Sequence, residues 1–474
     1  MRYSSTRAAQ PQTETRSFEE VLLAGLAEDG GLYVPDRLPV LDREVLRRYS
    51  GLTYDALAAR VLHLFADAAF SPDELQRFAA EAYSAFRHAA VTPLVQLDQG
   101  LWLLELFHGP TLAFKDLALQ FVGQLFDAVL ARRGAHVTII GATSGDTGSA
   151  ALEACRDRDA IDIFIFYPHG RVSEVQRRQM TTLAAENAHA IAIEGTFDDC
   201  QDLIKALFAD AQLRRAINLA AVNSINWARI AAQTVYYFAA ATALGAPDRR
   251  VSFSVPTGNF GNVYAGHIAR RMGLPIKRLV IGANRNDILV RYIATGEMAI
   301  APVEPSLSPS MDIQVSSNFE RLLFELKDRD GCAVDAAIAS FRRTGVLPRS
   351  EVEWRAAQRL FSAHRVDDTQ TMQIIAQTYA RSGMLIDPHT AVAVGAAQAE
   401  LAADRDHAPI VALACAHPAK FPDAVERATG IRPELPAALA DLFERKERFT
   451  VLPNDKGEAA RYIRAHTRRR ERTA

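Results

Sequence analysis

One lysine of this chain, Lys115, stands where an uncharged amine could form. The chain has 54 basic residues, and only seven of them are lysines. Lys115 lies in FHGPTLAFKDLALQFVGQLFDAVLARRG, whose apolar residues recur with the spacing of a well-buried helix. An ammonium in the first turn of such a helix faces the positive end of the helix dipole and loses part of its hydration. Both effects favour the neutral, nucleophilic amine. The alternative is a lysine that reaches solvent and pairs with Asp116.

A second segment with chemical potential is the glycine loop PTGNFGN (residues 256–262), which lies between an apolar strand and a helix. Glycines let successive backbone N–H groups approach an anion, and the start of a helix favours phosphate. The loop lacks both the GK[ST] of a P-loop and the GxGxxG of a dinucleotide site, so neither ATP nor a dinucleotide is indicated. The pattern predicts a phosphate site, with a plain tight turn as the alternative.

The loop GATSGDTGSAA (residues 141–151) also follows a strand and precedes a helix. Thr143, Ser144 and Thr147 add hydroxyl groups to its exposed amides, which makes it a second candidate anion site. Asp146 could instead serve only as the cap of the helix. Two anion sites and a reactive lysine are what pyridoxal phosphate (PLP) chemistry requires, with one loop for the cofactor phosphate and the other for an acidic substrate.

The elements that carry these loops are apolar strands that alternate with helices. The strand-like runs are HVTIIGA (136–142), IDIFIFYP (161–168), VSFSVP (251–256) and PIVALACA (409–416). Such alternation predicts an α/β fold whose parallel sheets are covered on both faces. Ligands of these folds bind at the carboxyl ends of the strands, where both glycine loops fall.

We expect three parts along the chain. Residues 1–92 show helical periodicity and are expected to form a mainly helical N-terminal domain. Residues 93–425 are expected to form the core, with two parallel-sheet α/β domains. Its smaller part, about 130–235, carries the GATSGDTG loop, and the larger part carries the reactive lysine and the PTGNFGN loop. Residues 426–474 are expected to form a helical extension with a basic tail.

Composition narrows the class of protein. The 474 residues are 49% hydrophobic and 23% charged, with a formal net charge of −2. This profile is typical of a soluble globular protein and indicates neither a nucleic-acid partner nor an anionic membrane. The most apolar long stretch, 231–246, is shorter than the roughly 20 residues of a membrane span. The four cysteines lie far apart without metal-ligand spacing, so we expect no metal site and a cytoplasmic protein with reduced thiols. A monomer or homodimer is also expected.

Taken together, several short segments resemble those of the threonine synthase family, in the same order and over nearly the whole chain. The resemblance is to the longer type of these enzymes, which have a helical N-terminal region and belong to the tryptophan-synthase-like fold type II of PLP enzymes. The matching segments are YSSTR, GLAEDGGLYVP, FHGPTLAFKD, GATSGDTGSAA, NSINWARI, PTGNFGN, DPHTAVA and AHPAKF.

The resemblance implies a role for the lysine and for each loop. Lys115 would be the Schiff-base lysine. The residues that would hold the PLP phosphate are Gly258, Asn259, Phe260, Gly261 and Asn262. Those that would hold the substrate carboxylate are Thr143, Ser144, Gly145, Asp146 and Thr147.

Other positions are candidates for the substrate phosphate. They are Asn226 and Arg229 of NSINWARI, together with Ser5 and Arg7. Arginine suits this role because its planar guanidinium binds phosphate through two hydrogen bonds. The alternative for the NSINWARI pair is a helix cap and a surface arginine. Lys420 of HPAKF is expected to position a loop or an anion rather than to catalyse.

The sequence departs from the family pattern at two positions. Cys415 stands where the family usually has a hydroxyl residue in contact with the pyridine nitrogen, so it is expected to bind the cofactor there. A thiol is a weaker hydrogen-bond partner, so either the contact survives with altered tuning or the thiol only fills the core. Ala8 follows STR where the family often has glycine, which weakens the expectation for the N-terminal contacts.

The reaction implied by the resemblance converts O-phospho-L-homoserine and water to L-threonine and phosphate. One alternative is a PLP-dependent O-phospho-lyase of the same family that gives 2-oxobutyrate. The other is a catalytically silent PLP-binding paralogue, against which the intact Lys115 and both intact loops argue.

Overall fold

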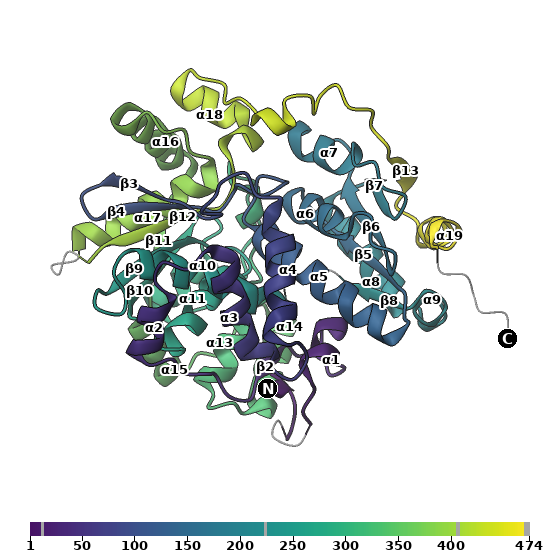
Figure 1. The fold of residues 1–474 in the computed structure, drawn as a ribbon, viewed down its shortest axis with the longest axis horizontal. Coiled ribbons are helices and arrows are strands. Elements are labelled where there is room, and N and C mark those ends of the chain that lie inside the picture. The colour runs from purple at the N-terminus through teal and green to yellow at the C-terminus, as the bar shows by residue number, and fades with distance from the viewer. Residues whose placement is uncertain (11–13, 222–224, 404–407, 469–474) are drawn as a thin grey trace.

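The computed structural model describes residues 1–10, 14–221, 225–403 and 408–468. Two parallel sheets lie side by side, one of six strands and one of five, and a small two-stranded sheet lies in the N-terminal region (Figure 1). The predicted α/β class with parallel sheets is therefore confirmed. Asn223 and Ser224 of the NSINWARI motif and the last six residues of the basic tail lie outside the described residues.

The N-terminal region is mainly helical, as expected, and it packs against the larger half of the molecule. Its helices are α1 (Phe18–Ala24), α2 (Arg43–Tyr49), α3 (Tyr54–Ala66) and α4 (Pro72–Ser84). Capping boxes at Ser17 and Ser71 satisfy the first amides of α1 and α4. The antiparallel pair β1 (Tyr3–Ser5) and β2 (Tyr33–Pro35) was not predicted.

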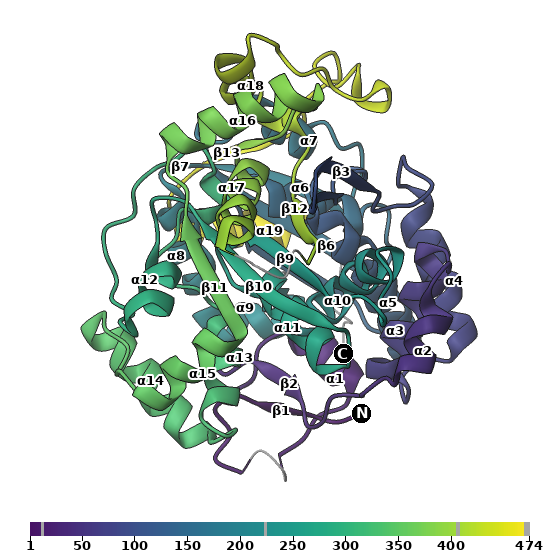
Figure 2. The same cartoon turned by 90° about the vertical axis from the view of Figure 1, so that its left-hand side faces the viewer.

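The six-stranded sheet has the order β11-β10-β9-β12-β4-β3 and is parallel except for the edge strand β3. Its strands are β3 (Leu94–Asp98), β4 (Leu101–Glu105), β9 (Val251–Pro256), β10 (Ile276–Ala283), β11 (Phe361–Arg365) and β12 (Ile410–Ala414). Helix α17 (Pro388–Ala403) packs against β9, β10 and β12 (Figure 2). The central strands β9 and β12 are buried along most of their length, as expected for a sheet covered on both faces.

The five-stranded sheet has the order β13-β7-β6-β5-β8 and is wholly parallel. Its strands are β5 (Val137–Ala142), β6 (Ile161–Pro168), β7 (Ala188–Glu194), β8 (Leu219–Ala221) and β13 (Thr450–Pro453). The helices that accompany it are α6 (Asp146–Cys155), α7 (Glu174–Thr181), α8 (Phe197–Ala209), α9 (Ala211–Ile217) and α19 (Lys456–His466). The C-terminal part, expected to be helical, thus also contributes a strand, β13, which pairs with β7 at the edge of this sheet.

The remaining helices belong to the larger half and to the segment that leaves it. They are α12 (Ile288–Thr295), α13 (Phe319–Leu326), α14 (Gly331–Thr344), α15 (Glu351–Leu360), α16 (Asp368–Ser382) and α18 (Pro422–Thr429). Short 3-10 turns lie at Pro309–Met311, Pro418–Lys420 and Ala437–Leu439. The chain after α18 passes over to the smaller half and reaches β13 and α19 (Figure 1).

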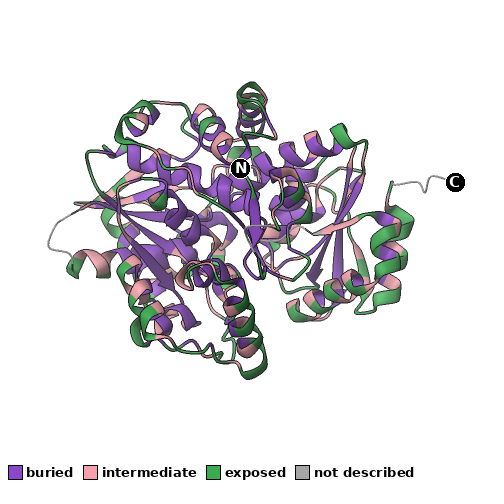
Figure 3. Cartoon of the chain, turned by 90° about the horizontal axis from the view of Figure 1, so that it is seen from below, coloured by how far each residue is buried: buried purple, intermediate pink, exposed green. Residues whose placement is uncertain are grey.

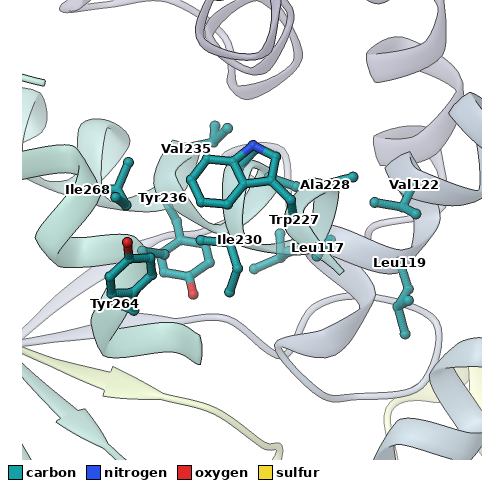
Figure 4. Close-up of a cluster of buried hydrophobic side chains, with 14 of the residues drawn as sticks. Leu117, Leu119, Val122, Trp227, Ala228, Ile230, Val235, Tyr236, Tyr264 and Ile268 are labelled. Atoms are coloured by element: carbon teal, nitrogen blue, oxygen red, sulfur yellow. The ribbon is translucent and has the colours of Figure 1, made fainter. Parts of the chain in front are cut away.

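The core between the halves is built on two long helices, α5 (Lys115–Arg133) and α10 (Trp227–Ala243), with α11 (Gly261–Arg271) beside α10. Leu117 of α5 and Ile230 of α10 lie close to one another in a cluster that also contains Trp227 and Tyr264 (Figure 4). Buried residues fill the middle of both large sheets, and exposed residues gather on the outer helices (Figure 3). No helix in the described part of the chain combines the length and the apolarity that crossing a bilayer requires.

Candidate active site

Lys115 is the first residue of α5, so the predicted position in the first helical turn is confirmed. The residue is only 9% exposed, and its Nζ atom lies 5.0 Å from the centre of the Phe114 ring. The alternative of a solvent-reaching lysine paired with Asp116 is wrong. The Asp116 carboxylate instead accepts hydrogen bonds from the Thr111 amide (2.8 Å) and hydroxyl (2.6 Å). Lys115 Nζ points to a different acid, Asp146.

The Asp146 carboxylate lies between two lysines. Its Oδ2 atom is 3.2 Å from Lys115 Nζ, and its Oδ1 atom is 2.9 Å from Lys420 Nζ. Gln176 Nε2 donates to Oδ1 at 2.8 Å. Burial alone raises the pKa of Asp146, but the two ammonium groups outweigh it and hold that pKa well below its ordinary value. Asp146 is not the helix cap of the alternative interpretation, because it is the first residue of α6 and Gly145 occupies the cap.

The loop before α6 presents amides on one side. Thr143 Oγ1 accepts from the N–H groups of Gly145 (3.0 Å) and Gly148 (2.8 Å), which fixes the turn. Gly145 has φ +141°, and a Cβ there would lie 2.4 Å from the Gln176 side chain, so the turn requires glycine. No described residue accepts a hydrogen bond from the N–H groups of Ser144, Asp146 or Thr147. These three donors are therefore free to bind an anion.

The loop between β9 and α11 is shaped by the segment 316–318, which binds its carbonyl groups. Ser316 Oγ donates to the Gly258 carbonyl at 2.7 Å, and Asn318 donates to the Asn259 carbonyl through N (3.1 Å) and Nδ2 (2.9 Å). Phe260 completes the turn in the left-handed region, with φ +61°. Within the described part of the chain, the N–H groups of Gly258, Asn259 and Phe260 have no acceptor. This is a second group of free donors at a helix start.

Asn262 and Cys415 join the two central strands at their carboxyl ends. The Asn262 side chain accepts from Tyr236 (2.6 Å) and Tyr237 (2.9 Å), and its Nδ2 atom lies 3.8 Å from Cys415 Sγ. Cys415 follows β12, and its carbonyl accepts from the Phe114 amide at 2.8 Å, next to Lys115. Burial raises the pKa of the Cys415 thiol, so the group is a neutral thiol.

The two predicted phosphate ligands of NSINWARI have different surroundings. Asn226 is the cap of α10: its Oδ1 atom accepts from the Ala228 amide (3.0 Å) and its Nδ2 atom donates to the Leu22 carbonyl (2.9 Å). The side chain is thus engaged in structure, as in the alternative interpretation. Arg229 is 4% exposed and is not a surface arginine. Its Nε and Nη1 atoms have no partner among the described residues, and burial lowers its pKa to about 10.

The N-terminal candidates are bound elsewhere. Arg7 forms a buried ion pair with Glu320, at 2.6 Å between Nη2 and Oε2. Ser5 donates to Asp29 at 2.8 Å. No contact among the described residues joins either side chain to the Lys115 cluster, which consists of Lys115, Asp146 and Lys420.

Several side chains near Lys115 and Lys420 were not predicted from the sequence. Asp387 and His389 form a buried pair, with 2.7 Å between Oδ2 and Nδ1, and His389 Nε2 accepts from the Ser310 amide at 3.3 Å. Their motif, DPHTAVA, was noticed without a role being assigned. The contacts of Gln176 with Asp146 and of Thr111 with Lys420 have no local signal in the sequence, because these partners lie far apart along the chain.

Comparison with known proteins identifies the family of the chain. Three family profiles match the chain: "Threonine synthase N terminus" (residues 2–83), "Pyridoxal-phosphate dependent enzyme" (85–339) and "Threonine synthase, C-terminal" (390–463). A threonine synthase of Pseudomonas aeruginosa is 54% identical over 99% of both chains.

Two solved structures are similar to the chain over nearly its full length. A PLP-bound threonine synthase of Brucella melitensis superposes with a TM-score of 0.95 at 50% identity and covers 99% of this chain and 100% of its own. The yeast threonine synthase gives 0.93 at 39% identity, with 98% of each chain covered. The fold is therefore PLP fold type II, and the chain belongs to the threonine synthase family.

Proposed function

We propose that this chain is a threonine synthase, which converts O-phospho-L-homoserine and water to L-threonine and phosphate with PLP as its cofactor. The observation that carries the proposal is the position of Lys115. Its amine is buried at the carboxyl end of a parallel sheet, within 3.2 Å of a carboxylate of the neighbouring half. Two groups of free backbone donors lie in the loops that follow β5 and β9, one strand from each large sheet. Family membership supplies the class of reaction, and this geometry supplies the residues.

The residues present fit PLP. The free N–H groups of Gly258, Asn259 and Phe260 would hold its phosphate, and a side chain at Gly258 would crowd the loop, because a Cβ there would lie 2.9 Å from the Ser310 carbonyl. Asn262 Nδ2 lies 3.8 Å from Cys415 Sγ, and Cys415 would contact the pyridine nitrogen. When bound, PLP withdraws electrons from the carbon atoms of an attached amino acid.

Lys115 has the central chemical role in this proposal. Its Nζ atom would hold the cofactor, and as a free amine it would take the proton from the substrate Cα. Asp146 lies 3.2 Å away and stabilises the resulting ammonium. The free amides of Ser144, Asp146 and Thr147, in the loop from Thr143, bind the substrate carboxylate.

Arg229 is the proposed ligand of the substrate phosphate. A buried guanidinium without an acid partner is unfavourable unless an anion reaches it. Asn226 caps the helix turn that carries Arg229, so its proposed contribution is to hold that turn. A bound phosphate would both satisfy Arg229 and stabilise the negative charge of the leaving group.

The product distinguishes this function from the alternatives, which the comparisons do not favour. The purified protein, loaded with PLP, is incubated with O-phospho-L-homoserine, and the products are measured by chromatography. We expect phosphate and threonine in equal amounts. Formation of 2-oxobutyrate would indicate a phospho-lyase, and absence of turnover with bound PLP would indicate a silent paralogue.

We also propose the finer features of organisation. The boundaries near residues 92 and 425 separate the N-terminal region and the C-terminal extension from the catalytic core. The protein works in the cytoplasm as a monomer or homodimer on a small-molecule substrate, in keeping with its four cysteines being free thiols. Light scattering of the purified chain measures the oligomeric state.

A further inference from the structure

Lys420 is the least exposed charged group of the Lys115 cluster. It ends the 3-10 turn Pro418–Lys420 after β12, and none of its surface is exposed. Its Nζ atom donates to the Thr111 carbonyl at 2.7 Å and lies 2.9 Å from Asp146 Oδ1. A lysine is rarely fully buried unless its ammonium group is paired.

The two oxygens of Asp146 are divided between the lysines. Lys420 and Gln176 contact Oδ1, and Lys115 contacts Oδ2. The buried group thus contains two cations and one anion. If Lys115 becomes neutral, Asp146 still has a cation at 2.9 Å. Without Lys420, neutralising Lys115 would leave a buried carboxylate with no ammonium beside it, which is unfavourable.

Lys420 also joins the segments that carry the other two members. Its Nζ atom and Gln179 Nε2 (3.0 Å) both donate to the Thr111 carbonyl, in the turn that leads into α5. Asp146 begins α6, after the five-stranded sheet, whereas Lys420 follows the six-stranded one. One ammonium therefore links both halves of the molecule to the start of the Lys115 helix.

Other titratable groups surround the three. Asp387 and His389 form their own pair, and the charge of His389 also acts on Asp146. Cys415 is a buried thiol beside Lys115 and Asp146. The charge of Lys420 also acts on Asp116 of α5, whose carboxylate accepts a hydrogen bond from Thr111. Of these groups, only Lys420 gives Asp146 a second ammonium within ion-pair distance.

We propose that Lys420 is a positioning residue that holds the Asp146 carboxylate in place and opposes its attraction for the Lys115 ammonium, so that Lys115 can lose its proton and react. The proposal rests on the function proposed for Lys115. The Asp146 carboxylate favours the Lys115 ammonium, whereas the like charge of Lys420 repels it and favours the neutral amine.

The test follows the reaction of Lys115 with PLP in the cofactor-free, full-length protein. The neutral amine condenses with the aldehyde and releases water; borohydride then delivers hydride to the carbon of the C=N bond, and solvent supplies the proton on nitrogen. The fraction of Lys115 modified is measured by mass spectrometry across a range of pH, which gives the pH of half-maximal trapping. This readout does not depend on turnover.

We expect Lys420→Met and Lys420→Gln to raise this pH midpoint by about one unit or more, the size of shift that one nearby charge produces. Glutamine keeps a hydrogen-bond donor but lacks the charge, so it tests the ammonium rather than the shape. The matched control is Lys205→Met, at an exposed lysine paired with Asp202, which should keep the wild-type midpoint. In an Asp146→Asn background, Lys420→Gln should still raise the midpoint, because the repulsion acts directly on the Lys115 ammonium.

Two results would overturn the proposal. One is a wild-type midpoint in Lys420→Gln, which would leave Lys420 a hydrogen-bonding role only. The other is a midpoint shift that disappears in the Asp146→Asn background, which would show that Lys420 affects Lys115 only through that carboxylate. Failure of the wild-type protein to trap PLP at Lys115 would instead contradict the proposed function. Circular dichroism identifies the folded variants, and the glutamine variant retains the test if Lys420→Met does not fold.

Discussion

The Nδ2 atom of Asn262 lies 3.8 Å from the Sγ atom of Cys415. This contact joins the first turn of α11 to the residue after β12, at the carboxyl ends of two neighbouring strands. The hydroxyl groups of Tyr236 and Tyr237 hold the other end of the Asn262 amide. Cys415 therefore has a fixed polar neighbour and does more than fill the core.

We predict different effects on stability for two substitutions of Cys415. Cys415→Ala removes the acceptor of a buried amide and should lower the free energy of unfolding by about 1 kcal/mol. Cys415→Ser supplies a better acceptor and should not. Urea unfolding of the cofactor-free protein measures both, and equal destabilisation by alanine and serine would mean that the contact with Asn262 is of no consequence.

Replacing Arg229 should separate stability from substrate binding. Arg229→Met removes a buried cation that has no acid partner, so we expect the free energy of unfolding to rise by about 1–2 kcal/mol. The same change should raise the KM for O-phospho-L-homoserine and abolish thermal stabilisation by inorganic phosphate. Arg461→Met, at an exposed ion pair with Glu458, is the control. A destabilised Arg229→Met protein that is still stabilised by phosphate would contradict the assignment.

Gly258 should not tolerate a side chain. A Cβ at this position would lie 2.9 Å from the Ser310 carbonyl, a backbone atom that cannot rotate away. We expect Gly258→Ala to displace the loop and to weaken PLP binding about tenfold or more, equivalent to at least ~1.4 kcal/mol. Absorbance titration measures the affinity. Gly457→Ala, on the exposed first turn of α19, should leave it unchanged, and equal affinities for both variants would refute the prediction.

His189 should make the fold sensitive to acid. Its ring stacks on Phe164 with 4.5 Å between centres, and burial lowers its pKa to about 4. His189 takes up a proton at a higher pH in the unfolded chain than in the folded chain. The free energy of unfolding is therefore not reduced by His189 above about pH 6.5, and it falls as the pH drops towards 4. His189→Phe should reduce the loss between pH 7 and about pH 5 by roughly 1–2 kcal/mol, a value reduced for the partial exposure of the ring. Urea unfolding at both pH values tests this against His169→Phe, and an unchanged pH slope in His189→Phe would contradict it.

The sequence predicted those parts of the fold that depend on local pattern. Apolar strands followed by glycine loops led to both parallel sheets, and the helical period of residues 114–130 led to α5 with Lys115 in its first turn. Strand β13 was missed because it is four residues long, half exposed, and is paired only with the distant β7. The β1–β2 pair is shorter still.

Within the site, the anion-binding backbone loops were easier to predict than the ion pairs. The two glycine loops show their free donors in the sequence because glycine and helix starts are local features. The partner of Lys115 is 31 positions away, so Asp116, its neighbour in sequence, was the natural alternative. Asn226 was predicted to bind phosphate, but a helix cap and a ligand need the same amide, and its amide is engaged in the cap.

The most direct test of the central claim asks which lysine carries the cofactor. The PLP-loaded protein is reduced with borohydride, digested, and analysed by mass spectrometry for the modified peptide. The account predicts modification at Lys115, and loss of both modification and threonine formation in Lys115→Ala, with Lys205→Ala unaffected. A modified peptide containing Lys420 or another lysine, or a Lys115→Ala protein that still makes threonine, would contradict it.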